Sequence, residues 1–254
     1  MNFIQIGKKN FEEWKTQGFC QEAVDLNAKI GEDYFDMASP GLFAGDIHAK
    51  LVLVHLNPKR NKEHWNKKCM YSSFNEYLEE HVHFGNKAYG KHVQEKIKSR
   101  FDMKQVRFLK PFEILPFNGE KCHDLEVALD QKLQLELVPL GSPNFDYHKI
   151  GVKNLKPFVT RMIDLLLEDE REYIIFCGRV FKEVLQEFII EERIHSFKLI
   201  KNDGKETKSA FEVINIKLEY NNSKITACIA PQFAKQGYPV GEYGKKVKEL
   251  YGKF

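Results

Sequence analysis

The sequence predicts an α/β fold of three layers, in which helices cover both faces of a central, mostly parallel sheet. Two observations predict it. Short apolar runs alternate along the chain with longer segments whose apolar residues recur at helical spacing. The short runs are continuously apolar, and this is typical of strands that a parallel sheet buries on both faces. We expect a single domain over residues 1–254.

The first half of the chain begins with one or two expected helices within residues 1–48. Phe11, Trp14 and Phe19 recur there near helical spacing after Asn10, a candidate N-cap. The first strand is expected at 51–54 and stops before Asn57-Pro58. Residues 59–125 are expected to form a basic insertion with helices near 75–83 and 91–101 and an extra strand at 106–114.

In the second half of the chain, expected strands and helices alternate more clearly. A strand at 133–138 stops at Pro139, and a helix capped by Asn154 carries six apolar residues at helical spacing between 155 and 166. A strand at 173–177 leads into a helix with an apolar stripe over 180–189. Further strands are expected near 197–200, at 211–218 and at 225–229. A short turn at 221–223 predicts that the 211–218 strand is antiparallel and lies at an edge.

Composition excludes several classes of protein. No apolar run approaches the roughly 20 residues that a membrane span needs, and the opening residues lack the pattern of a signal peptide. The five cysteines are scattered without a C-x-x-C pair, which indicates neither a zinc site nor a disulfide framework. We therefore expect a cytoplasmic protein without a metal or other cofactor, and no feature indicates an obligate protein partner.

Charge is unevenly distributed. Residues 59–110 contain thirteen Lys and Arg against six Asp and Glu, a local net charge of +7 in a chain whose net charge is +3. Such a segment can attract a polyanion, and DNA is the candidate partner. The alternative is a lysine-rich surface that only faces water.

Ligands of open parallel sheets bind at the carboxyl ends of the strands. This rule points to four places, each directly after an expected strand: Asn57-Pro58, Pro139 to Pro143, Gly178-Arg179, and Ala230 to Gln232. We expect the four places to converge on one cleft. P-loop, dinucleotide-binding, nucleophile-elbow and zinc-protease motifs do not occur in the sequence.

The four strand ends, in this order, resemble those of the uracil-DNA glycosylase superfamily. Over roughly 48–235, the chain offers one string for each element of the family pattern: His55-Leu56-Asn57-Pro58-Lys59, Leu135-Glu136-Leu137-Val138, Leu155-Lys156-Pro157-Phe158, Phe176-Cys177-Gly178-Arg179 and Ala230-Pro231-Gln232. The resemblance implies the uracil-DNA glycosylase fold and cleavage of an N-glycosidic bond after the base has been flipped out of the DNA helix.

The resemblance implies roles for several residues. Asn57 stands where the family positions the attacking water; the alternative is an Asn that only hydrogen-bonds the turn. Glu136 stands where the family has an Asn that contacts the base edge. An ionised Glu only accepts hydrogen bonds, so it disfavours a bare carbonyl. The alternative for Glu136 is an ion pair or an exposed strand end.

Other candidates complete the expected site. His55 is a base-binding candidate that replaces a usual Gly, and Ala230 replaces a His that donates to the base. Tyr71 and Phe74 are candidates for stacking on a base, although either could belong to the core. The remaining candidates are Pro231 and Gln232 for the base, and Lys59, Arg60 and Arg179 for phosphates.

The sequence is compatible with three functions. The first is a divergent DNA glycosylase that acts on a modified base, with weak or absent uracil excision. The second is a catalytically inactive protein of the same fold that binds nucleic acid or a nucleotide. The third is an unrelated α/β enzyme of small-molecule metabolism.

Overall fold

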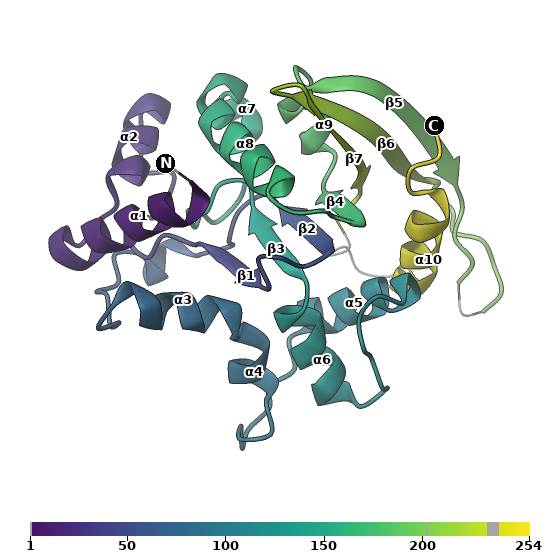
Figure 1. The fold of residues 1–254 in the computed structure, drawn as a ribbon, viewed down its shortest axis with the longest axis horizontal. Helices are drawn as coiled ribbons and strands as arrows, with labels where there is room; N and C mark the ends of the chain where they lie inside the picture. The colour runs from purple at the N-terminus through teal and green to yellow at the C-terminus, as the bar shows by residue number, and fades with distance from the viewer. Residues whose placement is uncertain (1, 202, 233–238) are drawn as a thin grey trace.

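The computed structural model describes residues 2–201, 203–232 and 239–254, and over these residues the strands form one seven-stranded sheet (Figure 1). The strand order is β1-β3-β2-β4-β7-β6-β5. The central strands β3 (Leu133–Glu136), β2 (Leu51–His55), β4 (Tyr173–Cys177) and β7 (Ser223–Ala230) are parallel. The outer strands β1 (Phe43–Gly45), β6 (Phe211–Tyr220) and β5 (Ile189–Phe197) are antiparallel to their neighbours.

Each face of the sheet is covered by its own set of helices. Val52 and Val54 of β2 point into a core formed with α1 (Phe3–Gln17), α8 (Val152–Leu167) and α9 (Val180–Val184). Leu51 and Leu53 point the opposite way, into a core formed with α5 (Arg100–Leu109), α6 (Lys121–Asp130) and α10 (Val240–Leu250). Because successive side chains of a strand alternate between faces, an unbroken apolar run fills both cores. The predicted α/β fold with helices on both faces is confirmed.

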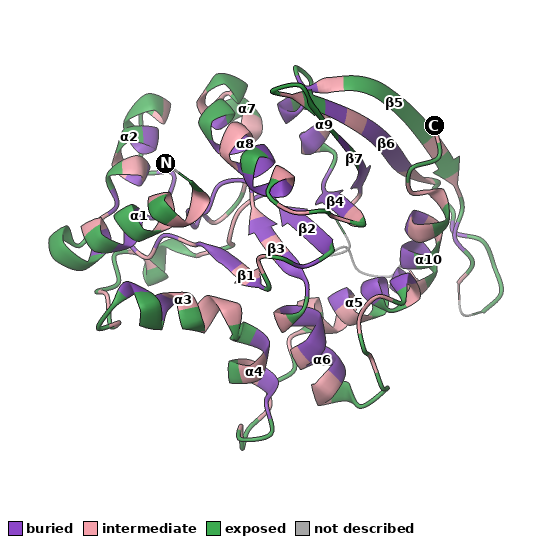
Figure 2. Ribbon diagram, viewed as in Figure 1, coloured by how far each residue is buried: buried purple, intermediate pink, exposed green. Residues whose placement is uncertain are grey.

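The remaining helices extend these layers. α2 (Gln21–Ile30) packs beside α1, and α7 (Tyr147–Ile150) precedes α8. α3 (Phe74–Val82) lies against the β1 edge, and α4 (Phe84–Tyr89) packs on α6 (Figure 1). Short 3-10 turns occur at Lys62–His64 and Lys110–Phe112. Figure 2 shows the contrast between the buried central strands and β5, whose residues are mostly exposed.

The stretch from 59 to 125, expected as an insertion, differs most from the sequence prediction. The strand expected at 106–114 is wrong, since α5 occupies 100–109 and a 3-10 turn follows. Phe108 and Leu109 of α5 are fully buried in the core shared with α10. The helix expected at 91–101 is absent from 91–99, whereas the one expected at 75–83 is confirmed as α3.

Several smaller predictions are also corrected. The helix with an expected stripe over 180–189 ends at Val184, and β5 already begins at Ile189, so the strand expected near 197–200 lies earlier. β6 is antiparallel as predicted, but it is not the edge strand because β5 pairs with its outer side. Asn2 rather than Asn10 caps α1. α8 begins at Val152, before the expected cap Asn154, whose amide nitrogen donates to Ile150 O at 2.7 Å.

Candidate functional site

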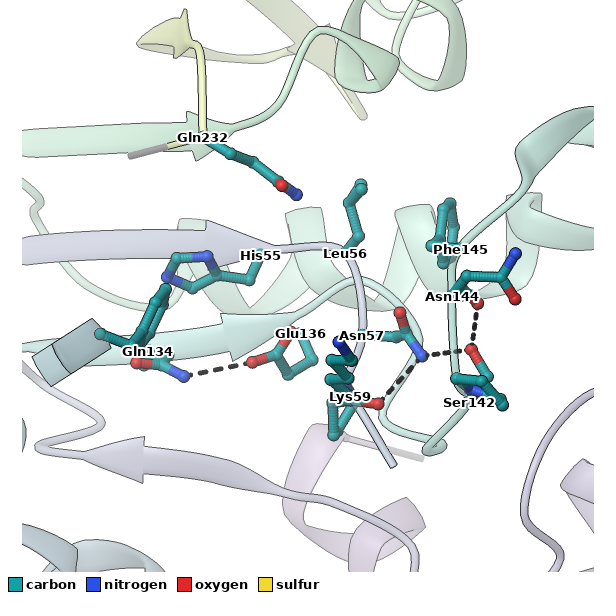
Figure 3. A pocket seen from close by; sticks show the side chains of 13 residues that line it. His55, Leu56, Asn57, Lys59, Gln134, Glu136, Ser142, Asn144, Phe145 and Gln232 are labelled. Carbon is teal, nitrogen blue, oxygen red and sulfur yellow. Dashed lines mark hydrogen bonds between the residues drawn. The ribbon is translucent and has the colours of Figure 1, made fainter. Parts of the chain in front are cut away.

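A cavity of about 540 Å³ opens at the carboxyl ends of β2 and β3 (Figure 3). We call it the strand-end cavity. Its walls come from segments far apart in the sequence: His55, Leu56, Asn57, Pro58, Lys59, Phe101, Gln134, Glu136, Ser142, Pro143, Asn144, Phe145 and Gln232. The cavity therefore lies where the rule for open parallel sheets places a ligand site.

Three of the four expected strand ends line this cavity. Asn57-Pro58 and Ser142-Pro143 contribute directly, and Gln232 follows β7. The fourth place lies beside it, since Gly178 adopts φ 145° and a Cβ at this position would be in van der Waals contact with the Gln232 and Leu56 side chains. The prediction of one cleft is confirmed for three of its four places.

Backbone pairing beyond β2 and β3 holds the two main walls together. Leu137 N donates to His55 O at 2.8 Å, and Ser142 N donates to Pro58 O at 3.1 Å. Arg60 N returns a bond to Ser142 O at 2.9 Å. The chain around Asn57 is thereby fixed against the loop at 137–142.

Asn57 uses its amide nitrogen to hold these loops. Its Nδ2 lies 2.8 Å from Ser142 Oγ, 3.2 Å from Leu140 O and 3.1 Å from Pro58 O. The Ser142 hydroxyl in turn donates to Asn144 O. An amide has two hydrogens, so these partners occupy its donors and leave Oδ1 as the group that can accept from a water or a ligand. Figure 3 shows this oxygen pointing away from Ser142.

Glu136 forms part of the opposite wall and is partly buried. Its Oε1 accepts from Gln134 Nε2 at 3.1 Å, while Oε2 is shielded from solvent without a hydrogen-bond partner among the residues described. Burial raises the pKa of Glu136 to about 8, against smaller opposing effects of Gln134 and Lys132. With such a pKa, the protonated form of Glu136, which both donates and accepts, is favoured at neutral pH over the ionised form that only accepts.

Glu136 ends a row of polar side chains on one face of β3. Lys132, fully buried, donates through Nζ to Gln134 Oε1 at 3.1 Å, and Gln105 Nε2 of α5 lies 3.3 Å from the same oxygen. We call Lys132, Gln134 and Glu136 the β3 row. Burial lowers the pKa of Lys132 to about 8. The two ionisable groups of the row do not form an ion pair, because the Gln134 amide lies between them.

His55 pairs in register with Glu136 and is 8% exposed. Its ring packs edge-on against Phe101 of α5, with 5.6 Å between centroids. Burial, together with the charge of Lys132, lowers the pKa of His55 to about 3. The imidazole is therefore neutral at physiological pH and brings no positive charge to the cavity.

The aromatic candidates Tyr71 and Phe74 lie elsewhere. Phe74 is 7% exposed and packs against Phe11 at 5.7 Å between centroids, and Tyr71 contacts Tyr77 at 5.1 Å. Both belong to the aromatic core between α1 and α3, which was the alternative interpretation of the sequence. They are therefore not placed to stack on a ligand in the strand-end cavity.

Phe101 and Phe145 line the cavity instead, and the sequence interpretation missed both. Phe145 follows the second strand end by only two residues, so the strand-end rule could have included it. Phe101 lies in the first turn of α5, far along the chain from either motif, and no local pattern points to it.

The last residue of β7 and the two residues that follow it divide between core and cavity. Ala230 is 1% exposed and packs in the core with α10, so it lies behind the cavity wall. Pro231 accepts from the Tyr243 hydroxyl at 3.4 Å and is not a cavity residue. Gln232 extends its amide toward the cavity (Figure 3). Gln232 is thus the residue of this segment that can contact a ligand.

The three cationic candidates have different surroundings. Lys59 is exposed, lines the strand-end cavity, and has no acidic partner among the residues described. Arg60 binds the buried Asp36 at 2.7 Å, and Arg179 pairs with Glu212 at 2.9 Å away from the cavity. A second cavity of about 400 Å³, the basic cavity, is lined by Lys59, Arg60, Asn61, His64 and Lys67. Lys59 therefore joins the two cavities.

Within the described part of the chain, no three His, Cys, Asp or Glu side chains gather as metal ligands would. Over the same residues, no helix combines the length and apolarity needed to cross a bilayer.

Comparison with known proteins gives no family assignment. No model of a protein family matches the chain, and no curated protein matches it. The geometry of the strand-end cavity is accordingly the basis on which a function is proposed.

Proposed function

We propose that the chain is a divergent DNA glycosylase-like protein whose strand-end cavity accepts a modified base. One observation carries the proposal: Asn57, Glu136 and Gln232, which come from three separate strand ends, line a single cavity. These are the segments through which the sequence resembles the uracil-DNA glycosylase superfamily. A cavity of about 540 Å³ falls within the range typical of small-ligand sites.

The cavity offers a group for each step of such a reaction. Asn57 Oδ1 can accept a hydrogen bond from a water and orient it, although an amide cannot remove its proton. Phe145 and Phe101 supply apolar ring surface of the kind on which bases stack. Glu136 and Gln232 supply polar groups for the edge of a base. Lys59 at the rim suits a phosphate.

We expect uracil excision to be weak or absent. Ala230 cannot donate a hydrogen bond, and His55 is neutral because burial lowers its pKa to about 3. The Gln232 amide, the Glu136 carboxyl group and Lys59 then remain as the groups that can contact a developing uracil anion. Loss of one well-placed donor typically slows such chemistry by about 10²–10³-fold.

The test is base release by the purified chain from oligonucleotides that carry uracil, hypoxanthine or an alkylated base, in single and double strands. Release of hypoxanthine or an alkylated base, with uracil release at least about 100-fold slower, is the expected result. Rapid uracil release that Asn57→Ala abolishes would overturn the uracil expectation. No release from any substrate would leave the second candidate, a catalytically inactive protein that binds nucleic acid.

Both candidates predict that DNA binding weakens steeply with salt. Lys59 and Lys67 line the basic cavity and have no acidic partners among the described residues, so each can neutralise a phosphate. Replacing either by Ala is expected to reduce the slope of log affinity against log salt by about 0.7–0.9. Fluorescence anisotropy of a labelled oligonucleotide, repeated over a series of salt concentrations, measures this slope.

Lys224→Ala is the matched control, because this exposed lysine lies on β7 and faces Glu219 at 3.9 Å. It is expected to leave the salt slope unchanged. An equal fall in slope for Lys224→Ala would show that the attraction is spread over the whole surface. Affinity that does not respond to salt would exclude phosphate contacts altogether.

A further inference from the structure

The carboxyl group of Glu136 has unusually little support for a negative charge. Its only hydrogen-bond donor among the residues described is the neutral Gln134 amide, which reaches Oε1 at 3.1 Å. Oε2 is out of contact with solvent and receives no donor from the described residues. A carboxylate without a cation or two or more donors is costly to bury, and its neutral form costs much less.

The nearest buried cation does not change this balance. Lys132 directs its ammonium group to Gln134 Oε1 at 3.1 Å, so the amide separates it from Glu136. The amide orientation is fixed by both neighbours, with its oxygen toward Lys132 and its nitrogen toward Glu136. Gln134 therefore holds the Glu136 side chain in one position at the cavity wall.

Each element packed against Glu136 contributes at least one further titratable group near it. They are His55 on β2, Lys59 after β2, Asp102 on α5, Lys132 on β3 and Cys177 on β4. Burial lowers the pKa of His55 and raises the pKa of Cys177, so both side chains are neutral. Asp102 acts on Lys132, whose pKa it raises, and Lys59 is exposed to solvent.

From this arrangement we propose that Glu136 recognises its ligand as a neutral carboxylic acid, with an O–H donor beside a C=O acceptor. Such a group complements a nitrogen heterocycle that has a hydrogen-bond acceptor next to an N–H donor. Bases with adjacent carbonyl and ring N–H groups, or with a ring nitrogen next to an amino group, have that edge. The carboxyl group then performs the task of an amide. The identity of the ligand rests on the proposed function, whereas the protonation of Glu136 does not.

A pH dependence with a definite direction follows. The form that binds is the protonated one, so affinity is complete below the pKa of Glu136 and is lost as the pH rises through about 8. Above that value, affinity is expected to fall about tenfold for each pH unit. Glu136→Gln keeps a donor beside an acceptor and cannot ionise, so its affinity is expected to stay level.

Two measurements test the proposal. The first is the carboxyl ¹³C NMR signal of Glu136 in the ligand-free protein, assigned by its disappearance in Glu136→Gln and followed from about pH 5 to about pH 10. The signal is expected to remain at its protonated position through neutral pH. The second is the Kd of cytosine and of adenine over the alkaline part of this range, by calorimetry. Glu187→Gln, an exposed site between α9 and β5, is the matched control with the wild-type profile.

The outcomes separate this proposal from the proposed function. A Glu136 signal already ionised near pH 6, or cytosine and adenine binding with the same pH profile in the wild type and Glu136→Gln, overturns the inference. Failure of either base to bind also overturns it. Absence of base release from oligonucleotides, with the pH-dependent binding intact, counts against glycosylase activity alone.

Discussion

Replacement of Asn57 by Ala is expected to slow base release from the best substrate of the oligonucleotide panel by about 10²–10³-fold. The amide nitrogen of Asn57 is held by Ser142 Oγ and Leu140 O, which leaves Oδ1 to orient the attacking water. No other side-chain amide follows β2 this closely at the cavity. Single-turnover release kinetics at saturating enzyme measure the chemical step without interference from binding.

The same substitution also removes hydrogen bonds between two loops, so a structural effect must be separated from a chemical one. Ser142→Ala removes the shortest of these bonds, at 2.8 Å, but keeps the Asn57 oxygen. We expect it to cost about 1 kcal/mol of stability and to slow release far less than Asn57→Ala. Equal losses of release in both variants, with equal losses of melting temperature, would mean that Asn57 only supports the loop.

The central sheet could be predicted because its strands depend on local pattern. The segments at 51–54 and 173–177 are short, apolar and bounded by turn residues, and the structure contains both strands. A strand that is buried on both faces has few alternatives at such a length. The short turn at 221–223 similarly predicted the antiparallel pairing of β6 with β7.

The α5 segment could not be predicted in the same way. Its apolar residues include Val106, Phe108 and Leu109, which fit either an alternating strand or one turn of a helix. The helical outcome depends on packing against α10, where Gly244 allows close approach: a Cβ there would lie 2.1 Å from Phe108 O. A contact with a helix that begins more than 130 residues later leaves no local trace.

In the candidate site, too, some residues could be predicted from the sequence and others could not. The strand-end rule located Asn57 and Gln232 because it depends on topology alone. It could not place Tyr71 and Phe74, whose positions depend on the aromatic side chains of α1. The raised pKa of Glu136 depends on its burial, which outweighs the opposing effects of Gln134 and Lys132, two and four residues earlier. This burial becomes visible only when the side of β3 that carries the three residues is known to be covered.

Replacement of Asp36 by Ala is expected to destabilise the protein by about 3–5 kcal/mol, the largest stability effect that we predict. Asp36 is fully buried, binds Arg60 Nη1 at 2.7 Å, and accepts from Ala38 N and Asn66 N at 3.1 Å. Its own N–H donates to Gly141 O at 2.8 Å. The carboxylate therefore links the segment before β1 to the loop after β2, and its removal leaves a partly buried Arg60 without its counter-ion.

Urea unfolding of Asp36→Ala, Arg60→Ala and the double variant measures this coupling. Because each single variant leaves the other charge uncompensated, the double variant is expected to lose less stability than the two single losses added together. Asp33→Ala, three residues earlier and exposed, is the control and is expected to change stability by less than about 0.5 kcal/mol. Strict additivity in the double variant would show that Asp36 and Arg60 act independently, and that Arg60 remains free to contact a phosphate.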